Sequence, residues 1–233
     1  MKRYAIYYTP QLNSPWWRVW SEWLGRDASS GSVFHRPFLE DIDRDVLSSL
    51  LRDPARYGLH ATIKAPFKLV REEDLGHLMD QLRQFCSGQS PFELKLKLEK
   101  LRDFFALTPM DDHLRIHQIS NAIVTQMDRF RMPLSDEEVA KRRLNGLTPL
   151  EDQMLLEWGY PYVLDCYQFH ISLTGRLDQL DAYSQRLIQH ELSIRLDSLS
   201  HTPLFVDSLC LFEEPHAGAD FLILERFQFG AFA

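Results

Sequence analysis

Two short segments of the chain place a histidine two residues before a hydroxyl side chain. The first reads His-Ala-Thr at residues 60–62, and the second reads His-Ile-Ser at residues 170–172. In a β-strand, alternate side chains share a face, so each histidine lies on the same face as its hydroxyl while apolar residues occupy the other. Residues two apart are separated by roughly 7 Å along a strand, which is close enough to hold one small anion between them.

The residue types of these two segments favour acid–base chemistry at phosphorus. Imidazole has an unperturbed pKa of about 6.5, so one histidine can remove a proton while the other supplies one near neutral pH. We therefore expect His60 and His170 to be catalytic, with either of them able to act as the base. Thr62 and Ser172 would hydrogen-bond the non-bridging phosphate oxygens, where negative charge increases in the transition state. This chemistry needs no metal and no other cofactor.

Four further residues are candidates for substrate binding. Lys64 and Thr174 continue the two polar strand faces, and Tyr8 ends the first predicted strand. Arg143 belongs to the basic run 141–143, which could form a second anion site for a distal phosphate of the substrate. Three of them have an ordinary alternative: Lys64 as a solvated lysine at a strand end, Tyr8 as a core or rim tyrosine, and the basic run of Arg143 as an exposed helix face.

Metal binding has little support in the sequence. His113 and His117 have the four-residue spacing of zinc ligands on a helix, but the glutamate of the HExxH motif and a third ligand are missing. Three widely separated cysteines form neither a disulfide framework nor a CxxC metal site; they are Cys86, Cys166 and Cys210. We expect them to be reduced in a cytoplasmic protein.

The charge balance limits the class of partner. The chain has 26 Lys and Arg against 33 Asp and Glu, a net charge of −7, which argues against long nucleic acid as a partner. A small phosphorylated substrate in a locally basic cleft remains compatible with this net charge.

Residues 1–3 lead directly into a β-prone run and not into the apolar core of a signal peptide. No apolar stretch approaches the roughly 20 residues that span a membrane. The sequence does not specify an oligomeric state.

Periodicity and capping signals predict an alternation of helices and strands. Before the first histidine motif we expect a strand over 3–9, a helix over 14–25 and a short helix over 44–52 that ends at Asp53-Pro54. A helix over 72–86 and strands over 92–98 and 104–107 follow the first motif, and a helix over 177–192 and strands over 204–213 and 221–229 follow the second. Between these groups lie three predicted helices, over 113–127, 135–144 and 148–159.

The same order of elements follows both motifs, which indicates an internal repeat. Pro91 opens a strand 31 residues after His60, and Pro203 opens one 33 residues after His170. We therefore predict an α+β fold, a single bilobal domain over 1–233 whose central antiparallel sheets form a cleft. Its parts would be a first motif unit at about 57–109, a helical insertion at about 112–159, a second motif unit at about 162–230, and a strand at 3–9 that completes the sheet.

The paired motifs, each bracketed by apolar residues, resemble the tandem signature of the two-histidine (2H) phosphoesterase superfamily. That superfamily includes cyclic nucleotide phosphodiesterases and RNA-end processing enzymes with a bilobal, internally duplicated fold. One branch, small bacterial proteins found with phosphonate-utilisation genes, is similar in the runs YAIYYTP, WLGRD, GLHATIKAPF, LTPLEDQMLLEWGYPYV and FHISLTG. Ser172 stands where threonine is commoner, and it retains the hydroxyl.

The resemblance implies metal-independent hydrolysis or transfer at a small, cyclic phosphodiester. That the substrate is a ribose or nucleoside cyclic phosphate, and that the reaction belongs to phosphonate metabolism, follows by analogy alone. Two other functions stay open: a non-catalytic module that binds a nucleotide or sugar phosphate, and a metal-dependent phosphoesterase. The two imidazoles favour the enzyme, because arginine would serve phosphate binding better.

Overall fold

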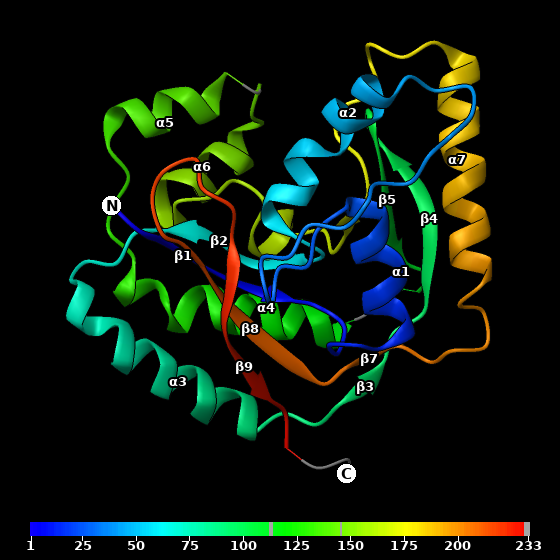
Figure 1. The fold of residues 1–233 in the computed structure, drawn as a ribbon. Helices are drawn as coiled ribbons and strands as arrows, with labels where there is room; N and C mark the ends of the chain where they lie inside the picture. Colours follow the sequence, from blue (N-terminus) through cyan, green and yellow to red (C-terminus); the bar gives the residue numbers. More distant parts are fainter. Residues whose placement is uncertain (112–113, 145, 231–233) are drawn as a thin grey trace.

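The computed structural model describes residues 1–111, 114–144 and 146–230, whose strands form one large antiparallel sheet flanked by helices (Figure 1). The strand order of the large sheet is β4-β5-β6-β2-β1-β8-β9, and β3 pairs with β7 in a separate two-stranded sheet. The α+β fold class is therefore confirmed. The strands are β1 (Arg3–Tyr8), β2 (Ala61–Phe67), β3 (Phe92–Glu93), β4 (Leu96–Leu101), β5 (Phe104–Pro109), β6 (Ile171–Ser172), β7 (Phe205–Val206), β8 (Ser208–Glu214) and β9 (Leu222–Gln228).

Several of the helices begin where a capping side chain satisfies their first free N–H groups. Ser14 caps the first helix, while Ser135 with Glu138 and Thr148 with Glu151 form capping boxes for α5 and α6, as their sequence signals predict. The α-helices are α1 (Pro15–Leu24), α2 (Arg44–Tyr57), α3 (Leu75–Ser87), α4 (Leu114–Gln126), α5 (Asp136–Arg143), α6 (Pro149–Trp158) and α7 (Ala182–Asp197). Short 3₁₀ turns are η1 (Glu72–Asp74), η2 (Asp128–Phe130) and η3 (Leu164–Cys166).

The two motif strands, β2 and β6, lie side by side in the middle of the large sheet. The β4–β5 hairpin follows β2 in the chain but pairs with β6, whereas the β8–β9 hairpin follows β6 and pairs with β1, next to β2. The helices are not exchanged: α3 follows β2 and packs on β8 and β9, on the half that holds β2, and α7 follows β6 and packs on β4, on the half that holds β6 (Figure 1). The hairpin of each motif unit thus completes the half of the sheet that holds the other motif.

Four predicted elements have different bounds in the structure. The helix expected over 177–192 is α7, five residues further along the chain, and the strand expected over 204–213 is divided into β7 and β8. The strand expected over 92–98 is divided, because β3 pairs with β7 while β4 turns to pair with β5. The helix expected to end before Pro54 continues to Tyr57, which brings the last turn of α2 over the sheet.

Pro54 creates a link between α2 and the second motif. Proline has no N–H, so the carbonyl of Leu50, four residues earlier, has no helical donor. That carbonyl accepts the backbone N–H of Gly175 at 2.7 Å, three residues after Ser172. A Cβ atom at Gly175 would lie 2.8 Å from the same oxygen, so this close approach requires glycine.

We predict that Gly175→Ala lowers the free energy of unfolding by about 1–3 kcal/mol, because the added methyl group forces α2 away from the second motif. Chemical denaturation followed by circular dichroism measures the change. Gly76→Ala is the matched control: nothing lies within 4 Å of a Cβ at this helical glycine, so the variant should be neutral or more stable by about 0.5–1 kcal/mol. Equal stability of Gly175→Ala and the wild type would contradict the role of the Leu50 contact.

Candidate active site

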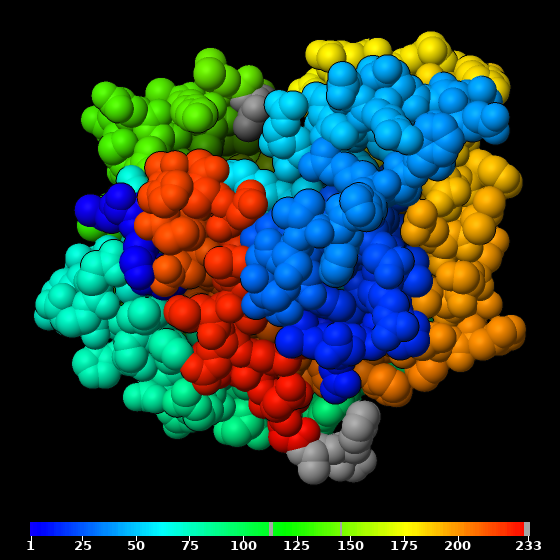
Figure 2. All heavy atoms as spheres, viewed as in Figure 1, coloured from blue at the N-terminus to red at the C-terminus, as the bar shows by residue number. Residues whose placement is uncertain are grey.

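A cavity of about 400 Å³ lies over the centre of the sheet, where both histidine motifs contribute to its wall. Residues of α2 border it on one side, and Arg142 of α5 and Tyr160 border it on the other. The surface is hollowed between these two parts of the chain (Figure 2). The four side chains of the two histidine–hydroxyl motifs all line it: His60, Thr62, His170 and Ser172.

The register of β2 and β6 explains how these four side chains meet. Ala61 pairs with Ile171 in an antiparallel bridge. Continued by one residue in each direction, that register sets His60 opposite Ser172 and Thr62 opposite His170. Opposed residues share a face, and diagonal neighbours are roughly 7–8 Å apart, so the two imidazoles can flank a single phosphate group.

Both imidazoles are held in the same orientation relative to their own strands. The Nδ1 atom of His60 lies 2.8 Å from the carbonyl oxygen of Gly58, and that of His170 lies 2.9 Å from the carbonyl oxygen of Gln168. A carbonyl oxygen only accepts, so Nδ1 carries the proton in both rings. Each Nε2 atom is left free to accept or donate a proton at the cavity.

Aromatic neighbours reduce the contact of both rings with water. His60 packs against Tyr7, with ring centroids 4.1 Å apart, and against Tyr57 at 5.8 Å. Burial is the main cause that lowers the pKa of His60 to about 4, and the nearby His170 lowers this pKa further. His170 lies 5.7 Å from Phe104, and burial also lowers its pKa below the usual 6.5. Both histidines are therefore neutral at pH 7 in the free protein.

The hydroxyl groups of the two motifs are available to a ligand. Within the described residues, neither Thr62 nor Ser172 uses its hydroxyl in a hydrogen bond, although both side chains line the cavity. Thr174 also lines the cavity, but its Oγ1 accepts the backbone N–H of Phe105 at 2.9 Å and so supports the neighbouring strand.

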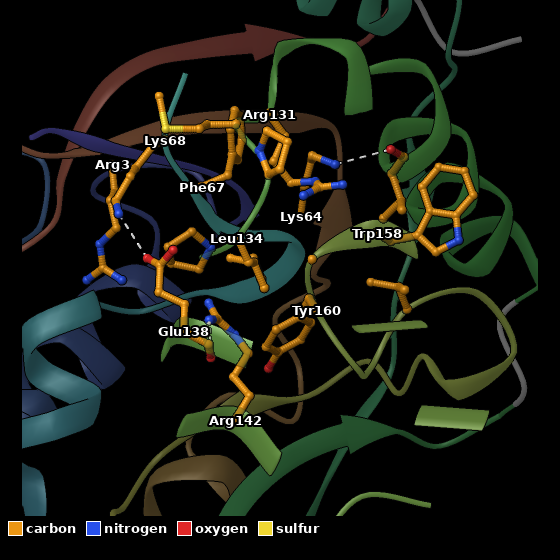
Figure 3. A pocket seen from close by; sticks show the side chains of 17 residues that line it. Arg3, Lys64, Phe67, Lys68, Arg131, Leu134, Glu138, Arg142, Trp158 and Tyr160 are labelled. Carbon is orange, nitrogen blue, oxygen red and sulfur yellow. Dashed lines mark hydrogen bonds and ion pairs between the residues drawn. The ribbon is translucent and has the colours of Figure 1, made fainter. Parts of the chain in front are cut away.

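Lys64 does not line this cavity, which corrects the expectation that it shares a face with Thr62. Tyr7 pairs with Thr62 but Ile6 pairs with Lys64, so β2 contains an extra residue at this point. Such a bulge interrupts the alternation of faces. Lys64 is buried on the α4 side, where its ammonium group donates to the Val124 carbonyl at 3.2 Å and pairs with Asp128 at 3.2 Å (Figure 3).

Tyr8 and Arg143 also lie away from the cavity, and in each case the preceding residue lines it. Tyr8 is fully buried and donates its hydroxyl to the carbonyl of Phe205 at 3.1 Å, because it shares the core face of β1 with Ala61 opposite. Tyr7 takes the cavity face instead.

Arg143 makes a two-pronged ion pair with Asp152 on α6, with N–O distances of 2.6 and 2.8 Å. Arg142, half-buried, faces the cavity in its place. The sequence shows both arginines in one basic run, and only the rotation of α5 against the sheet distinguishes them. Arg3 and Tyr57 also line the cavity, and no motif marked either of them.

Among the described residues, no group of three His, Cys, Asp or Glu side chains is placed to hold a metal ion. His113, one of the pair with zinc-like spacing, lies outside the described residues, and His117 packs edge-on against Tyr167. No helix in the described ranges has the length and apolar character to cross a membrane.

Two curated proteins and several solved structures are similar to this chain. It is 37% identical over 234 residues to the ribose 1,5-bisphosphate phosphokinase PhnN of Janthinobacterium sp. (strain Marseille), covering 98% of this chain and 51% of that protein. It is 34% identical to the protein of the same name from Laribacter hongkongensis (strain HLHK9), covering 94% of this chain and 50% of the relative. The chain therefore spans about half the length of the curated relatives it matches.

Among solved structures, E. coli LigT in its apo form aligns over 98% of both chains, with 12% identity and a TM-score of 0.46. The model of one protein family, described as "Protein of unknown function (DUF1045)", matches residues 62–222. That match begins in the first histidine motif, includes the second, and covers well over half of the 233 residues. The chain therefore belongs to the DUF1045 family.

Proposed function

We propose that the protein is a phosphodiesterase that opens a small, cyclic phosphodiester by general acid–base catalysis with its two histidines. The observation that carries the proposal is the arrangement of the motifs around one cavity. Two imidazoles with anchored Nδ1 atoms and free Nε2 atoms lie beside two hydroxyls that have no other partner among the described residues. This is the set of groups that hydrolysis of a phosphodiester requires without a metal.

The different surroundings of the histidines suggest a role for each. Burial lowers the pKa of His60 to about 4 and its aromatic packing is the closer of the two, so it is neutral over a wide pH range and suits the base. His170 packs less closely and suits the acid, once an anionic phosphate raises its pKa. Because the two rings interact, measured pKa values belong to the pair.

In the proposed reaction, Nε2 of His60 accepts a proton from water while the water oxygen forms a bond to phosphorus. The bond from phosphorus to the leaving ester oxygen breaks, and that oxygen takes the proton from Nε2 of protonated His170. Because the ester is cyclic, the product is a single molecule that carries a phosphate monoester and a free hydroxyl, with His60 protonated and His170 neutral. Thr62 and Ser172 donate hydrogen bonds to the non-bridging oxygens, where charge increases.

The names of the curated relatives support a phosphorylated ribose as the substrate class. Both are named for a kinase of ribose 1,5-bisphosphate, and this chain matches about half of each. The sequence of 233 residues contains no GxxxxGK[ST] loop, which kinases of the P-loop class use to hold ATP phosphates. We therefore assign the kinase activity of those relatives to their other half, and to this half a ribose or nucleoside cyclic phosphate, in phosphonate metabolism.

We predict that His60→Ala and His170→Ala each lower kcat by about 10²–10⁴-fold, because each removes one positioned proton-transfer group. Phosphorus NMR with a panel of ribose and nucleoside cyclic phosphates measures turnover. His190→Ala is the matched control, since His190 is exposed on α7 and should keep wild-type activity. Wild-type rates for either motif variant would contradict the mechanism, and no turnover by the wild type on any substrate would favour a binding module.

The roles of the two histidines can be separated by the leaving group. The p-nitrophenolate group of a p-nitrophenyl phosphodiester leaves without protonation. His170→Ala should therefore keep far more activity on this substrate than His60→Ala does. Equal losses of activity in the two variants would remove the assignment of His60 as base and His170 as acid, and a larger loss in His170→Ala would reverse it.

We predict that kcat/KM has an optimum between about pH 4 and pH 6.5. The base His60 is lost by protonation as the pH falls through its pKa of about 4, so activity declines on the acid side. The acid His170 is lost by deprotonation as the pH rises through its lowered pKa, so activity declines before neutral pH. Initial rates at substrate concentrations well below KM measure the profile, and a rate that keeps rising to pH 9 would contradict it.

We predict that turnover persists after treatment with excess EDTA, because the four cavity groups can supply both proton transfer and phosphate binding. Phosphorus NMR before and after dialysis against the chelator provides the measurement. A loss of activity that Zn²⁺, Mn²⁺ or Mg²⁺ restores would instead indicate a metal-dependent phosphoesterase.

A further inference from the structure

The cavity extends beyond the four motif side chains. Its wall includes a second group of residues that we call the arginine–tyrosine end: Arg3, Tyr7, Tyr57, Arg142 and Tyr160. These residues come from β1, from α2, from α5 and from the segment after α6. The reaction proposed above uses none of their polar groups, so this end needs an explanation of its own.

Arg142 has an unpaired charge in the wall of the cavity. Within the described residues, no carboxylate forms an ion pair with it, and its guanidinium donates to the backbone carbonyl of Glu138 at 3.2 Å. The Glu138 carboxylate is directed to Lys68 at 2.9 Å, while the Arg142 guanidinium lies beside Tyr160 (Figure 3). Burial lowers the pKa of Arg142 from its usual value. Arginine keeps its proton in proteins, so the side chain is charged.

The neighbouring charges increase the positive potential at this end. Arg3 and Arg56 both pair with Glu214, whose carboxylate is fully buried. Two guanidiniums thus share one negative charge, and Arg142 adds a third cation within electrostatic reach of Arg3. The Glu138 carboxylate also acts on Arg142, but it forms its own ion pair with Lys68. Four positive charges against the two carboxylates of Glu214 and Glu138 leave a local excess of two in a chain whose net charge is −7. Such an excess in a cleft attracts anions.

Three tyrosine hydroxyls border the same space. Burial raises the pKa of Tyr160 to about 12 and that of Tyr7 well above its usual value, so both are neutral donors. No hydrogen bond within the described residues uses either hydroxyl. The Tyr57 oxygen accepts from Arg56 at 3.1 Å and keeps its own proton to donate. Guanidinium and hydroxyl donors without competing acceptors are the groups that hold phosphate.

We propose that the arginine–tyrosine end binds a second anionic group of the substrate, a phosphate monoester on the same small molecule as the phosphodiester. Arg142 supplies the charge and the fork of donors, and the hydroxyls of Tyr7, Tyr57 and Tyr160 complete the site. The proposal rests on the phosphodiesterase function, since it names the substrate class for the same cavity.

The position of Tyr7 relates the two ends of the cavity. Its ring packs on His60 at 4.1 Å, and its hydroxyl interacts with Tyr57, Tyr160, Arg3 and Arg56. Tyr7 thus borders His60 and lies within electrostatic reach of the arginines, so one small molecule can contact both ends. A volume of about 400 Å³ suits a pentose with two phosphate groups.

Steady-state kinetics with matched substrates test the proposal. The pair is ribose 2,3-cyclic phosphate with and without a 5-phosphate, and the readout is the ratio of their kcat/KM values. We expect the wild type to prefer the phosphorylated substrate at least tenfold, and Arg142→Gln to lower that ratio about 10–100-fold, as loss of a charge-assisted hydrogen bond implies. Arg142→Lys, which keeps the charge but loses the fork, should give an intermediate ratio.

Arg143→Gln is the matched control, because the neighbouring arginine has the same chemistry but pairs with Asp152 outside the cavity. Its ratio should equal that of the wild type. Thermal unfolding of both variants identifies any general loss of structure. A wild type without preference, or Arg142→Gln with the wild-type ratio, would overturn the proposal, and so would equal ratios in the Arg142 and Arg143 variants.

A second measurement separates this proposal from the proposed function. Ribose 5-phosphate has no diester to hydrolyse, so calorimetric titration measures its binding without turnover. We expect its Kd to rise about tenfold or more in Arg142→Gln but not in Arg143→Gln. If that holds while no cyclic phosphate is hydrolysed, the anion site stands and the phosphodiesterase function fails. If cyclic phosphates are hydrolysed but neither the Kd of ribose 5-phosphate nor the ratio of kcat/KM values depends on Arg142, the phosphodiesterase function stands and the anion site fails.

Discussion

The antiparallel pairing of Ala61 with Ile171 is the contact on which the whole cavity depends. It joins two residues that are 110 positions apart in the chain, and β6 itself contains only two residues. So short a strand cannot hold its place by its own hydrogen bonds. Its surroundings hold it instead: β5 pairs with its other edge, the indole of Trp23 donates to the Leu173 carbonyl at 2.7 Å, and Leu50 accepts the N–H of Gly175.

The exchange of hairpins explains why the two motif units form one cavity and not two. Each motif strand is flanked by strands from outside its own unit, so neither unit alone can build the sheet around its histidine. A phosphate bound between β2 and β6 would contact both units at once. The duplicated unit thus supplies two half-sites, and the antiparallel register sets them diagonally opposite each other.

The electrostatics of the cavity differ from those of the chain as a whole. The protein is acidic, yet the cavity contains two neutral imidazoles, unshared hydroxyls and an excess of arginine at one end. Glu214 is fully buried and bound by two of those arginines, and the Glu138 carboxylate near Arg142 is paired with Lys68, so neither offers much repulsion to an anion. The net charge of the chain therefore bears on its solubility and not on the charge of the ligand that the cavity binds.

The sequence by itself determined the elements, their order and the histidine–hydroxyl pairs, because strand alternation, capping and periodicity are local properties. The tertiary structure decided which further side chains join them. A bulge in β2 turns Lys64 away, the register of β1 selects Tyr7 over Tyr8, and the rotation of α5 selects Arg142 over Arg143. A shift of one residue in strand register, or the corresponding rotation of a helix, would bring the neighbouring side chain to the cavity instead. Register and rotation are both set by packing between segments that are distant in the chain.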